Sequence, residues 1–291
     1  MACSTPRCGA TPWIGSRPGR TRTMSDGKDA AVGMVDQLDG RGGPTEEALA
    51  FARAYMAEGE MDPALLARLT DPEAIAERER LKTEQRQRDW ANLGYYRAAN
   101  AALAGQRTDV VFMGDSITEM WRIAQPDLFE SGRVNRGISG QTSPQMLIRF
   151  MPDVVALKPR AVHLMCGTND VAGNTGPTTP QDYRNNIIAM TDLAHANGIA
   201  VILADVPPMN GLPWSSGVQD PQARVAELNG WLRGFAREKG VTHVDYGAVL
   251  TDGGAGMRAE FTRDGVHPGA GGYAAMRPLA EGAVEQALGR R

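Results

Sequence analysis

The stretch that decides the fold is Asp109-Val-Val-Phe-Met113, followed directly by Gly114-Asp115-Ser116-Ile117-Thr118. The first five residues form a short apolar run of the length expected for a buried strand. Glycine then permits a tight turn, and the residues after it begin a helical pattern. A strand that turns directly into a helix is the repeating unit of parallel α/β proteins.

The same alternation continues toward the C-terminus. Further apolar runs predict strands at 133–135, 161–166, 199–204 and 241–244. Helical patterns separate them at 117–129, 143–157, 180–197, 220–239 and 270–288. This order predicts a five-stranded parallel sheet covered on both faces, a three-layer α/β/α sandwich. Functional sites in such sheets lie at the carboxyl ends of the strands.

Residues 44–106 are predicted to form a helical segment before the α/β domain, which is expected to span 107–291. Thr45 carries an N-cap signal, and Asp71-Pro72-Glu73 opens a second, longer helix rich in charged residues. An apolar stripe is predicted to dock this segment on the main domain, formed by Trp90, Leu93, Tyr96 and Ala99. No chemistry is predicted here.

Residues 1–43 are expected to be a leader or an over-extended start, outside the fold. Residues 1–23 contain four arginines, no acid and no apolar run, so they do not resemble a secretory signal. They are either an arginine-rich targeting or disordered leader, or sequence before a true start at Met24, which we favour. Without a recognisable signal peptide, the expected location is the cytoplasm.

Composition narrows the class of protein. A hydrophobic share of 42% and a charged share of 22% are ordinary for a globular protein, and a net charge of -3 argues against nucleic-acid binding. No stretch approaches the roughly 18 apolar residues of a membrane span. Cys3 and Cys8 lack nearby histidines for zinc binding, and Cys166 ends an apolar run as a core thiol. The oligomeric state is not indicated.

Ser116 follows the first strand and would stand at the start of a helix. Its own N–H would then point to a place where a developing oxyanion is stabilised. The alternative is that Ser116 only caps the helix, and for this loop alone that interpretation is favoured.

Two more loops offer oxyanion donors. The loop Asn135-Arg-Gly137-Ile-Ser-Gly140 brings backbone close to a ligand, and Gly137 is predicted to present its N–H. The loop Gly167-Thr168-Asn169-Asp170 offers the Asn169 amide. Taken alone, the Gly137 loop is better explained as a plain strand-to-helix turn, and the alternative for Asn169 is an Asx-turn or a helix cap.

A candidate base precedes the last helix, in Asp264-Gly-Val-His267-Pro268. Asp264 lies three residues before His267, close enough in a turn to orient the imidazole and fix its tautomer. An Asp-Gly turn with an incidental histidine is the alternative. The other histidines lack such a partner and are interpreted as structural: His163, His195 and His243.

Together the four loops supply a nucleophile, three oxyanion donors, a base and its orienting acid at one rim of the sheet. The sequence therefore predicts a hydrolase of carboxylic esters that forms an acyl-Ser116 intermediate. A binding module without catalysis is the alternative from another class.

In these residues the chain resembles the SGNH (GDSL-like) hydrolase superfamily, including bacterial acetylesterases and the catalytic subunits of platelet-activating-factor acetylhydrolase. The resemblance covers residues 107–288. It implies Ser116 as nucleophile, His267 as base and Asp264 as its orienter, with Ser116, Gly137 and Asn169 as oxyanion hole. It also implies a flavodoxin-like fold, no cofactor and no metal.

The expected substrate is a small acyl ester, acetyl above all, with an acetylated carbohydrate as one candidate. The proline-rich loop from Asp205 to Trp214 leaves the carboxyl edge of the sheet and carries bulky apolar residues. Predicted substrate contacts are Pro208, Met209, Trp214 and Val266. Packing against a neighbouring helix is nearly as well supported for these side chains. Hydrolysis of longer acyl chains and acyl transfer to a sugar hydroxyl remain alternatives.

Overall fold

The computed structural model describes residues 42–251 and 253–289, which belong to one compact unit. Five parallel strands form its sheet in the order β2-β1-β3-β4-β5. Their bounds are Val110–Gly114 for β1, Arg133–Gly137 for β2, Ala161–Met165 for β3, Ala200–Ala204 for β4 and Thr242–Val244 for β5. The predicted five-stranded parallel sheet is confirmed. The expectations for residues 1–41 lie outside the described part of the chain.

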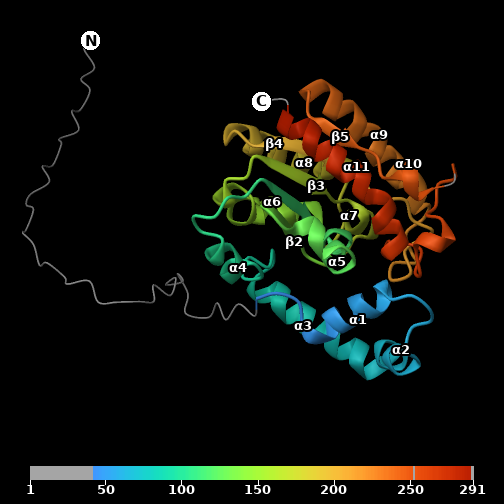
Figure 1. Ribbon diagram of the computed structural model, residues 1–291. Coiled ribbons are helices and arrows are strands. Elements are labelled where there is room, and N and C mark those ends of the chain that lie inside the picture. Colours follow the sequence, from blue (N-terminus) through green and yellow to red (C-terminus); the bar gives the residue numbers. More distant parts are fainter. Residues whose placement is uncertain (1–41, 252, 290–291) are drawn as a thin grey trace, which may run out of the picture. The chain divides into compact units, whose positions relative to one another are not determined.

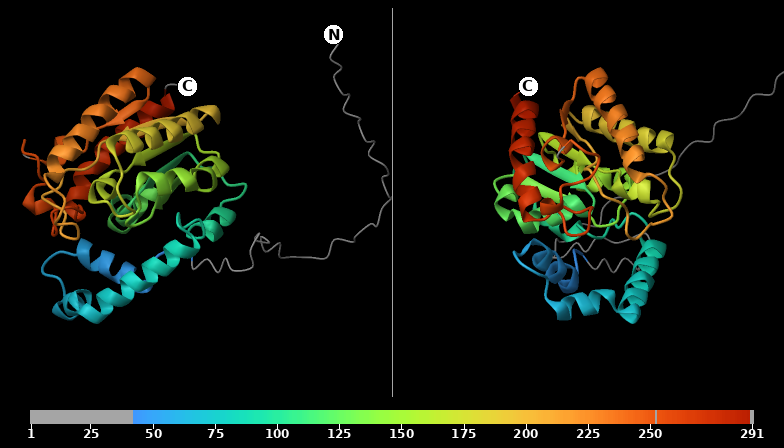
Figure 2. Two further views of the ribbon diagram at one scale, coloured as in Figure 1. Left: turned by 180° about the vertical axis from the view of Figure 1, so that it is seen from behind. Right: turned by 90° about the vertical axis from the view of Figure 1, so that its right-hand side faces the viewer.

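Helices cover both faces of this sheet (Figure 1). One face is covered by α6 (Ser143–Asp153), α8 (Pro180–Ala196) and α9 (Pro221–Lys239), and the other by α5 (Ser116–Ala124) and α11 (Ala270–Gly289). The side view in Figure 2 separates these layers. Two short helices follow strands β3 and β5: α7 (Thr168–Ala172) and α10 (Gly247–Leu250). The three-layer α/β/α arrangement is confirmed.

Strand β1, at Val-Val-Phe-Met-Gly, shows why a central strand is apolar along its whole length. Val111 and Met113 pack into the core under α6, α8 and α9, whereas Val110 and Phe112 pack into the core under α5 and α11. Successive side chains of a strand point to opposite faces, so a central strand of a sheet with two covered faces is buried along its whole length.

Two predicted helices end early. The helix predicted at 117–129 ends at Ala124, and a 3-10 helix follows at Pro126–Phe129. Proline has no backbone N–H to continue the helix, and it disfavours helical geometry in the residue before it. The helix predicted at 143–157 ends at Asp153 and is followed by a 3-10 helix at Val155–Leu157.

The N-terminal segment is helical, in four pieces: α1 (Glu46–Met56), α2 (Pro63–Thr70), α3 (Pro72–Arg88) and α4 (Arg97–Ala102). Thr45 and Asp71 cap α1 and α3 as predicted. The predicted stripe is wrong as a helical stripe, because residues 89–96 form turns and Trp90 is 39% exposed. Tyr96 is buried all the same. In Figure 1 the four helices run along one end of the α/β core.

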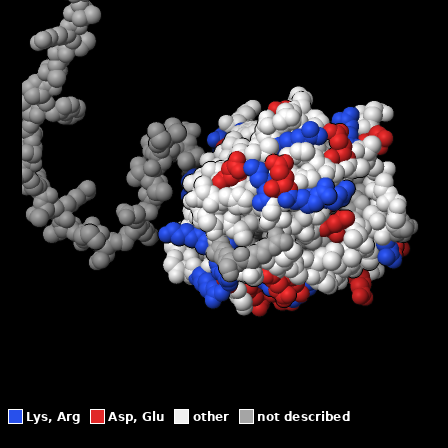
Figure 3. Space-filling view, turned by 90° about the horizontal axis from the view of Figure 1, so that it is seen from above, with Lys and Arg blue, Asp and Glu red and all other residues white. Residues whose placement is uncertain are grey.

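The surface shows no concentration of one charge on the face seen in Figure 3, where acidic and basic side chains are intermingled. Within the described residues, none of the helices combines the length and the apolar character needed to cross a bilayer.

The buried Arg149 side chain links two segments at the carboxyl edge of the sheet, the end of β1 and the loop after β2, by hydrogen bonds. This side chain is fully buried on α6 and donates to the Gly114 carbonyl at 2.9 Å, to the Gln141 side chain and to Asp153 at 3.0 Å. The carboxyl end of β1 and the loop after β2 are therefore held by one guanidinium.

Replacing Arg149 by methionine should destabilise the fold by about 3 to 5 kcal/mol, since it leaves the buried Asp153 carboxylate without its charge partner. Urea unfolding measures this difference. The double variant Arg149→Met/Asp153→Leu should recover part of the loss, because it removes the unpaired charge as well. A single variant as stable as the wild type would contradict this role.

Candidate active site

Ser116 is the first residue of α5, directly after the turn that ends β1. Asp115 caps the helix by accepting the Ile117 N–H at 2.9 Å. Gly114 makes the turn possible, because a Cβ there would lie 2.0 Å from the Thr118 hydroxyl oxygen and 2.8 Å from the Met165 carbonyl. Among the described residues the Ser116 N–H finds no hydrogen-bond acceptor, so it is available to a ligand at the helix N-terminus.

The structure brings the three residues of the predicted triad together. Ser116 Oγ lies 2.9 Å from His267 Nε2, and His267 Nδ1 lies 2.6 Å from Asp264 Oδ2. If Nδ1 carries the proton that the carboxylate accepts, Nε2 is left with its lone pair toward the serine hydroxyl. This geometry would allow Ser116 to act as a nucleophile, with His267 as its base and Asp264 as the acid that orients the base.

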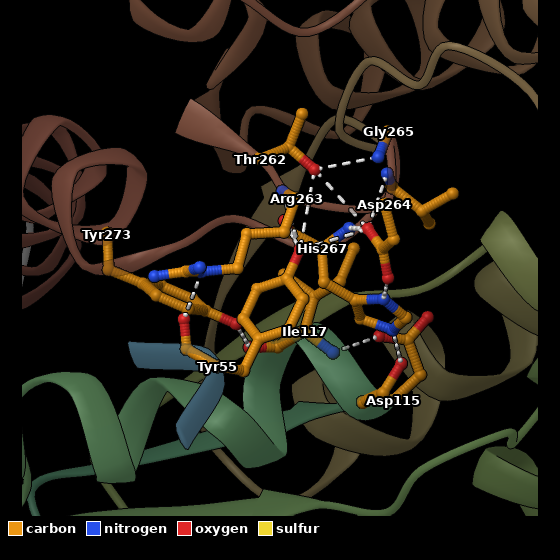
Figure 4. A network of polar contacts seen from close by, with 11 residues as sticks. Tyr55, Asp115, Ile117, Thr262, Arg263, Asp264, Gly265, His267 and Tyr273 are labelled. Carbon is orange, nitrogen blue, oxygen red and sulfur yellow. Dashed lines mark hydrogen bonds and ion pairs between the residues drawn. The ribbon is translucent and has the colours of Figure 1, made fainter. Parts of the chain in front are cut away.

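Asp264 is held as a carboxylate by its surroundings (Figure 4). Its Oδ1 accepts the N–H groups of Val266 at 2.9 Å and His267 at 2.8 Å. Burial raises the pKa of Asp264. The hydrogen bond to His267, the positive charge of the imidazolium and the two backbone hydrogen bonds together outweigh burial, and they hold the pKa of Asp264 well below its usual range. The group that faces the imidazole is thus ionised at neutral pH.

Asn169 lies in α7, and its side-chain amide points toward the turn after β1 and the loop after β2. Its Nδ2 donates to the Gln141 carbonyl at 3.0 Å and to Asp115 Oδ2 at 3.3 Å. Asn174 fixes which way the amide faces, because its own Nδ2 donates to Asn169 Oδ1 at 2.7 Å. The NH₂ group of Asn169 therefore points toward the loops that carry Asp115 and Gln141. Sequence reasoning missed Asn174, which no spacing rule singles out.

Gly137 does not lie as the sequence prediction placed it. Its N–H is donated to Asn135 Oδ1 at 2.9 Å, and its carbonyl accepts a hydrogen bond from Tyr96. A Cβ at Gly137 would also meet the Glu119 backbone N at 2.2 Å. This glycine lets β2 pack closely on α5, and in this structure its N–H is not free for an oxyanion.

Gly140, three residues later in the same loop, has the free N–H that Gly137 lacks. Its φ of +79° is a conformation that glycine adopts readily, and its N–H donates to no acceptor within the described residues. The next residue, Gln141, accepts from Asn169, and Asn174 approaches the Gly140 carbonyl at 3.4 Å. Gly140 is therefore beside the Asn169 amide.

The predicted substrate contacts separate into two groups. Trp214 lies at the site: its ring centroid is 6.1 Å from that of His267, and its Nε1 donates to Asn174 Oδ1 at 3.1 Å. Met209 and Val266 are each 1% exposed and belong to the hydrophobic core, and Pro208 is buried. These three residues present no open wall to a substrate in this structure.

The remaining histidines lie apart from Ser116. His163 is buried in β3 beside the Tyr246 hydroxyl at 2.8 Å, and burial lowers its pKa to about 3, so it is neutral. His243 pairs with Asp205 at 2.6 Å, so the expectation that it lacks a carboxylate partner is wrong, because that partner comes from the end of β4 rather than from its own segment. His195 is exposed near the end of α8.

Comparisons with known proteins agree with this geometry. Residues 112–275, more than half of the chain, match the GDSL-like lipase/acylhydrolase family. A GDSL-like lipase from Bacteroides thetaiotaomicron is 40% identical, with a TM-score of 0.66 over 69% of this chain and 100% of the other. The chain therefore belongs to this family and is a hydrolase.

Two more distant similarities say less about the function of this chain, because the identity is low or the matched stretch is short. An acetylxylan esterase, Axe2 from Geobacillus stearothermophilus, shares the fold at 22% identity, with a TM-score of 0.51 over 61% of this chain and 94% of the other. An uncharacterized lipoprotein of Bacillus subtilis, YqeF, is 34% identical over 79 residues. That match spans 26% of this chain and about a third of the relative, 32% of its length.

Two buried carboxyl groups, those of Asp115 and Asp170, accept hydrogen bonds at the starts of α5 and α6. Their contribution to the stability of the fold depends on pH. Burial raises the pKa of Asp115 and that of Asp170 to about 6 each. Asp170 accepts the backbone N–H of Ser143 at 3.0 Å and its hydroxyl at 2.5 Å, which fixes the start of α6.

The variant Asp170→Asn should gain stability relative to the wild type as pH rises from about 4 to 7. A carboxyl group whose pKa is raised on folding stabilises the protein below its unfolded pKa, near 3.8, and this contribution is lost as pH rises through about 6. The change in the difference between the two proteins should approach about 3 kcal/mol. Urea unfolding at several pH values measures it, and a difference independent of pH would contradict the assignment.

Proposed function

We propose that this protein is a serine esterase that cleaves short-chain acyl esters, acetyl esters above all, through an acyl-Ser116 intermediate. The observation that carries the proposal is the continuous chain from Ser116 Oγ to His267 Nε2 at 2.9 Å and from His267 Nδ1 to Asp264 Oδ2 at 2.6 Å. It stands at a helix N-terminus with a free N–H, where negative charge is stabilised.

In the acylation step, Ser116 Oγ attacks the ester carbonyl carbon while His267 Nε2 takes the serine proton. The imidazolium that forms lies against the ionised Asp264, which stabilises it. His267 then gives the proton to the departing alcohol, and the acyl group stays on Ser116. In the second step His267 accepts a proton from water, the hydroxide attacks the acyl carbonyl, and the acid leaves as Ser116 regains its proton.

The oxyanion of each tetrahedral intermediate needs preorganised donors. The N–H of Ser116 and the amide of Asn169 fit this role, as predicted from the sequence. Because the N–H of Gly137 is donated to Asn135, we assign the third donor to Gly140. The longer bond of Asn169, at 3.3 Å to Asp115, is the one that an oxyanion can replace most easily.

Ser116→Ala should abolish turnover of p-nitrophenyl acetate while leaving the fold intact. The serine hydroxyl is the nucleophile, and its one described side-chain partner is His267, so its loss removes chemistry rather than packing. Initial rates and urea unfolding of both proteins measure the two effects. Residual activity near that of the wild type would assign the nucleophile elsewhere.

The preference for a short acyl group comes from what surrounds the site. Most apolar side chains of the loop after β4 are buried in the hydrophobic core: Met209 and Leu212 are 1% and 5% exposed. Trp214, at 47% exposed, stands over His267 from that loop. Each buried methylene of an acyl chain is worth about 0.8 kcal/mol, so an enzyme for long chains is expected to expose an apolar groove there.

Across acetyl, butyryl, octanoyl and palmitoyl esters of one leaving group, kcat/KM should be highest at acetyl or butyryl. Trp214→Ala is the companion variant, and it should narrow the gap between short and long chains because it removes the bulk beside His267. A maximum at octanoyl or longer in the wild type would contradict the proposed substrate class and favour a lysophospholipase or thioesterase.

A further inference from the structure

Tyr55 belongs to α1, the first N-terminal helix, and α1 lies outside the residues that match the family. The side chain is nevertheless 3% exposed and reaches the loop that carries the base. Figure 4 shows its ring pointing from α1 toward Asp264 and His267. This contact could not be predicted from the sequence, because a tyrosine late in an amphipathic helix is commonly just a core residue.

The Tyr55 hydroxyl lies among four polar groups of that loop. It is 3.0 Å from Asp264 Oδ1 and 2.8 Å from the His267 carbonyl, and one hydroxyl hydrogen serves one of these acceptors at a time. It also accepts the Arg263 N–H at 3.0 Å, and the Thr262 hydroxyl is at 3.5 Å. The Tyr55 ring meets the imidazole of His267 edge-on, with centroids 6.3 Å apart.

Arg263 makes the connection in the opposite direction, from the loop to the end of α1. Its guanidinium donates to the carbonyls of Tyr55 at 3.0 Å and Gly59 at 2.8 Å, and to that of Ala57. The first of these carbonyls is in the last turn of α1, where helix carbonyls lack partners and a cation is favourable. The loop and the helix thus bind each other through two side chains.

Asp264 needs such support because it is not sealed from solvent. Its side chain is 32% exposed, against 18% for His267. Oδ2 faces the imidazole, while Oδ1 accepts from two backbone N–H groups and the Thr262 hydroxyl of its own loop, and lies 3.0 Å from the Tyr55 hydroxyl. Tyr55 is the side-chain donor to Oδ1 that comes from a separate element of the fold, so it fixes the carboxylate relative to the sheet.

We infer that Tyr55 is a positioning residue for the Asp264–His267 pair, so that helix α1 is part of the catalytic machinery. The inference rests on the proposed function. The hydroxyl fixes the position of the Asp264 carboxylate relative to the backbone of His267. The imidazole then stays where Nε2 is 2.9 Å from Ser116 Oγ. A displacement of a catalytic group by about 1 Å can lower the rate of an enzyme about 100-fold.

The test is Tyr55→Phe, which keeps the ring and removes the hydroxyl. The matched control is Tyr246→Phe, since that hydroxyl is also buried and hydrogen bonded, to His163 at 2.8 Å, but touches no residue of the site. With p-nitrophenyl acetate, Tyr55→Phe should lower kcat about 10- to 100-fold with KM within about twofold of the wild type. Tyr246→Phe should keep kcat while losing comparable stability.

A second measurement does not depend on turnover. A proton held between His267 Nδ1 and Asp264 is protected from exchange with water and gives a downfield proton resonance, which His267→Gln identifies by its absence. The resonance should be present in the wild type, Ser116→Ala and Tyr246→Phe, and broadened or lost in Tyr55→Phe. An unchanged resonance and an unchanged kcat in Tyr55→Phe would overturn the inference, as would an equal loss of kcat in Tyr246→Phe.

The two proposals fail in different ways. If the wild type and Ser116→Ala hydrolyse the ester equally, the proposed function is wrong, and the resonance still decides whether Tyr55 holds the pair. If Ser116→Ala is inactive but Tyr55→Phe is fully active with its resonance intact, the esterase assignment stands and the role of Tyr55 falls.

Discussion

The close packing around Gly114, where β1 turns into α5, is the constraint on which the rest of the structure depends. A side chain there would collide with Thr118 and with the Met165 carbonyl of β3. The Gly114 carbonyl accepts the Ile138 N–H at 3.1 Å and the Arg149 guanidinium at 2.9 Å. The turn that leads to Ser116 is thereby hydrogen bonded to the loop after β2 and to α6, and it packs closely against β3.

This junction gathers the loops after β1, β2 and β3 at one rim of the sheet, and the N-terminal segment then supports the rim from outside. On one side Tyr96 donates to the Gly137 carbonyl, and Tyr95 donates to Glu119, whose carboxylate also accepts the Ser139 N–H at 2.9 Å. On the other side Tyr55 reaches the loop of the base. The N-terminal segment, which lies outside the residues that match the family, thus contacts the loop after β2 through the turn before α4 and the loop of His267 through α1.

Those parts of the fold and site that depend on local pattern could be predicted from the sequence. Strand β1 and the Gly114-Asp115-Ser116 turn follow from an apolar run that ends in glycine, and the distance of three residues from Asp264 to His267 suits a turn. What could not be predicted depends on contacts between distant segments. Tyr55 contacts residues more than 200 positions away.

The prediction of Gly137 as an oxyanion donor rested on local sequence in the same way. The two glycines are alike in sequence, and only the tertiary structure shows that Asn135 takes the N–H of one and leaves the other free. The same holds for Met209 and Val266, since an apolar residue near a catalytic loop can face the substrate or the core. Side-chain direction in an irregular loop has no periodicity from which to read it.

The central claim is that Ser116 carries the acyl group between the two steps of the reaction. Its most direct measurement is mass spectrometry of peptides from enzyme mixed briefly with p-nitrophenyl acetate and quenched in acid. The account predicts one added acetyl group on the peptide that contains Ser116, absent from the Ser116→Ala variant. Turnover of the ester with no acetylated peptide, or with the acetyl group on another residue, would contradict it.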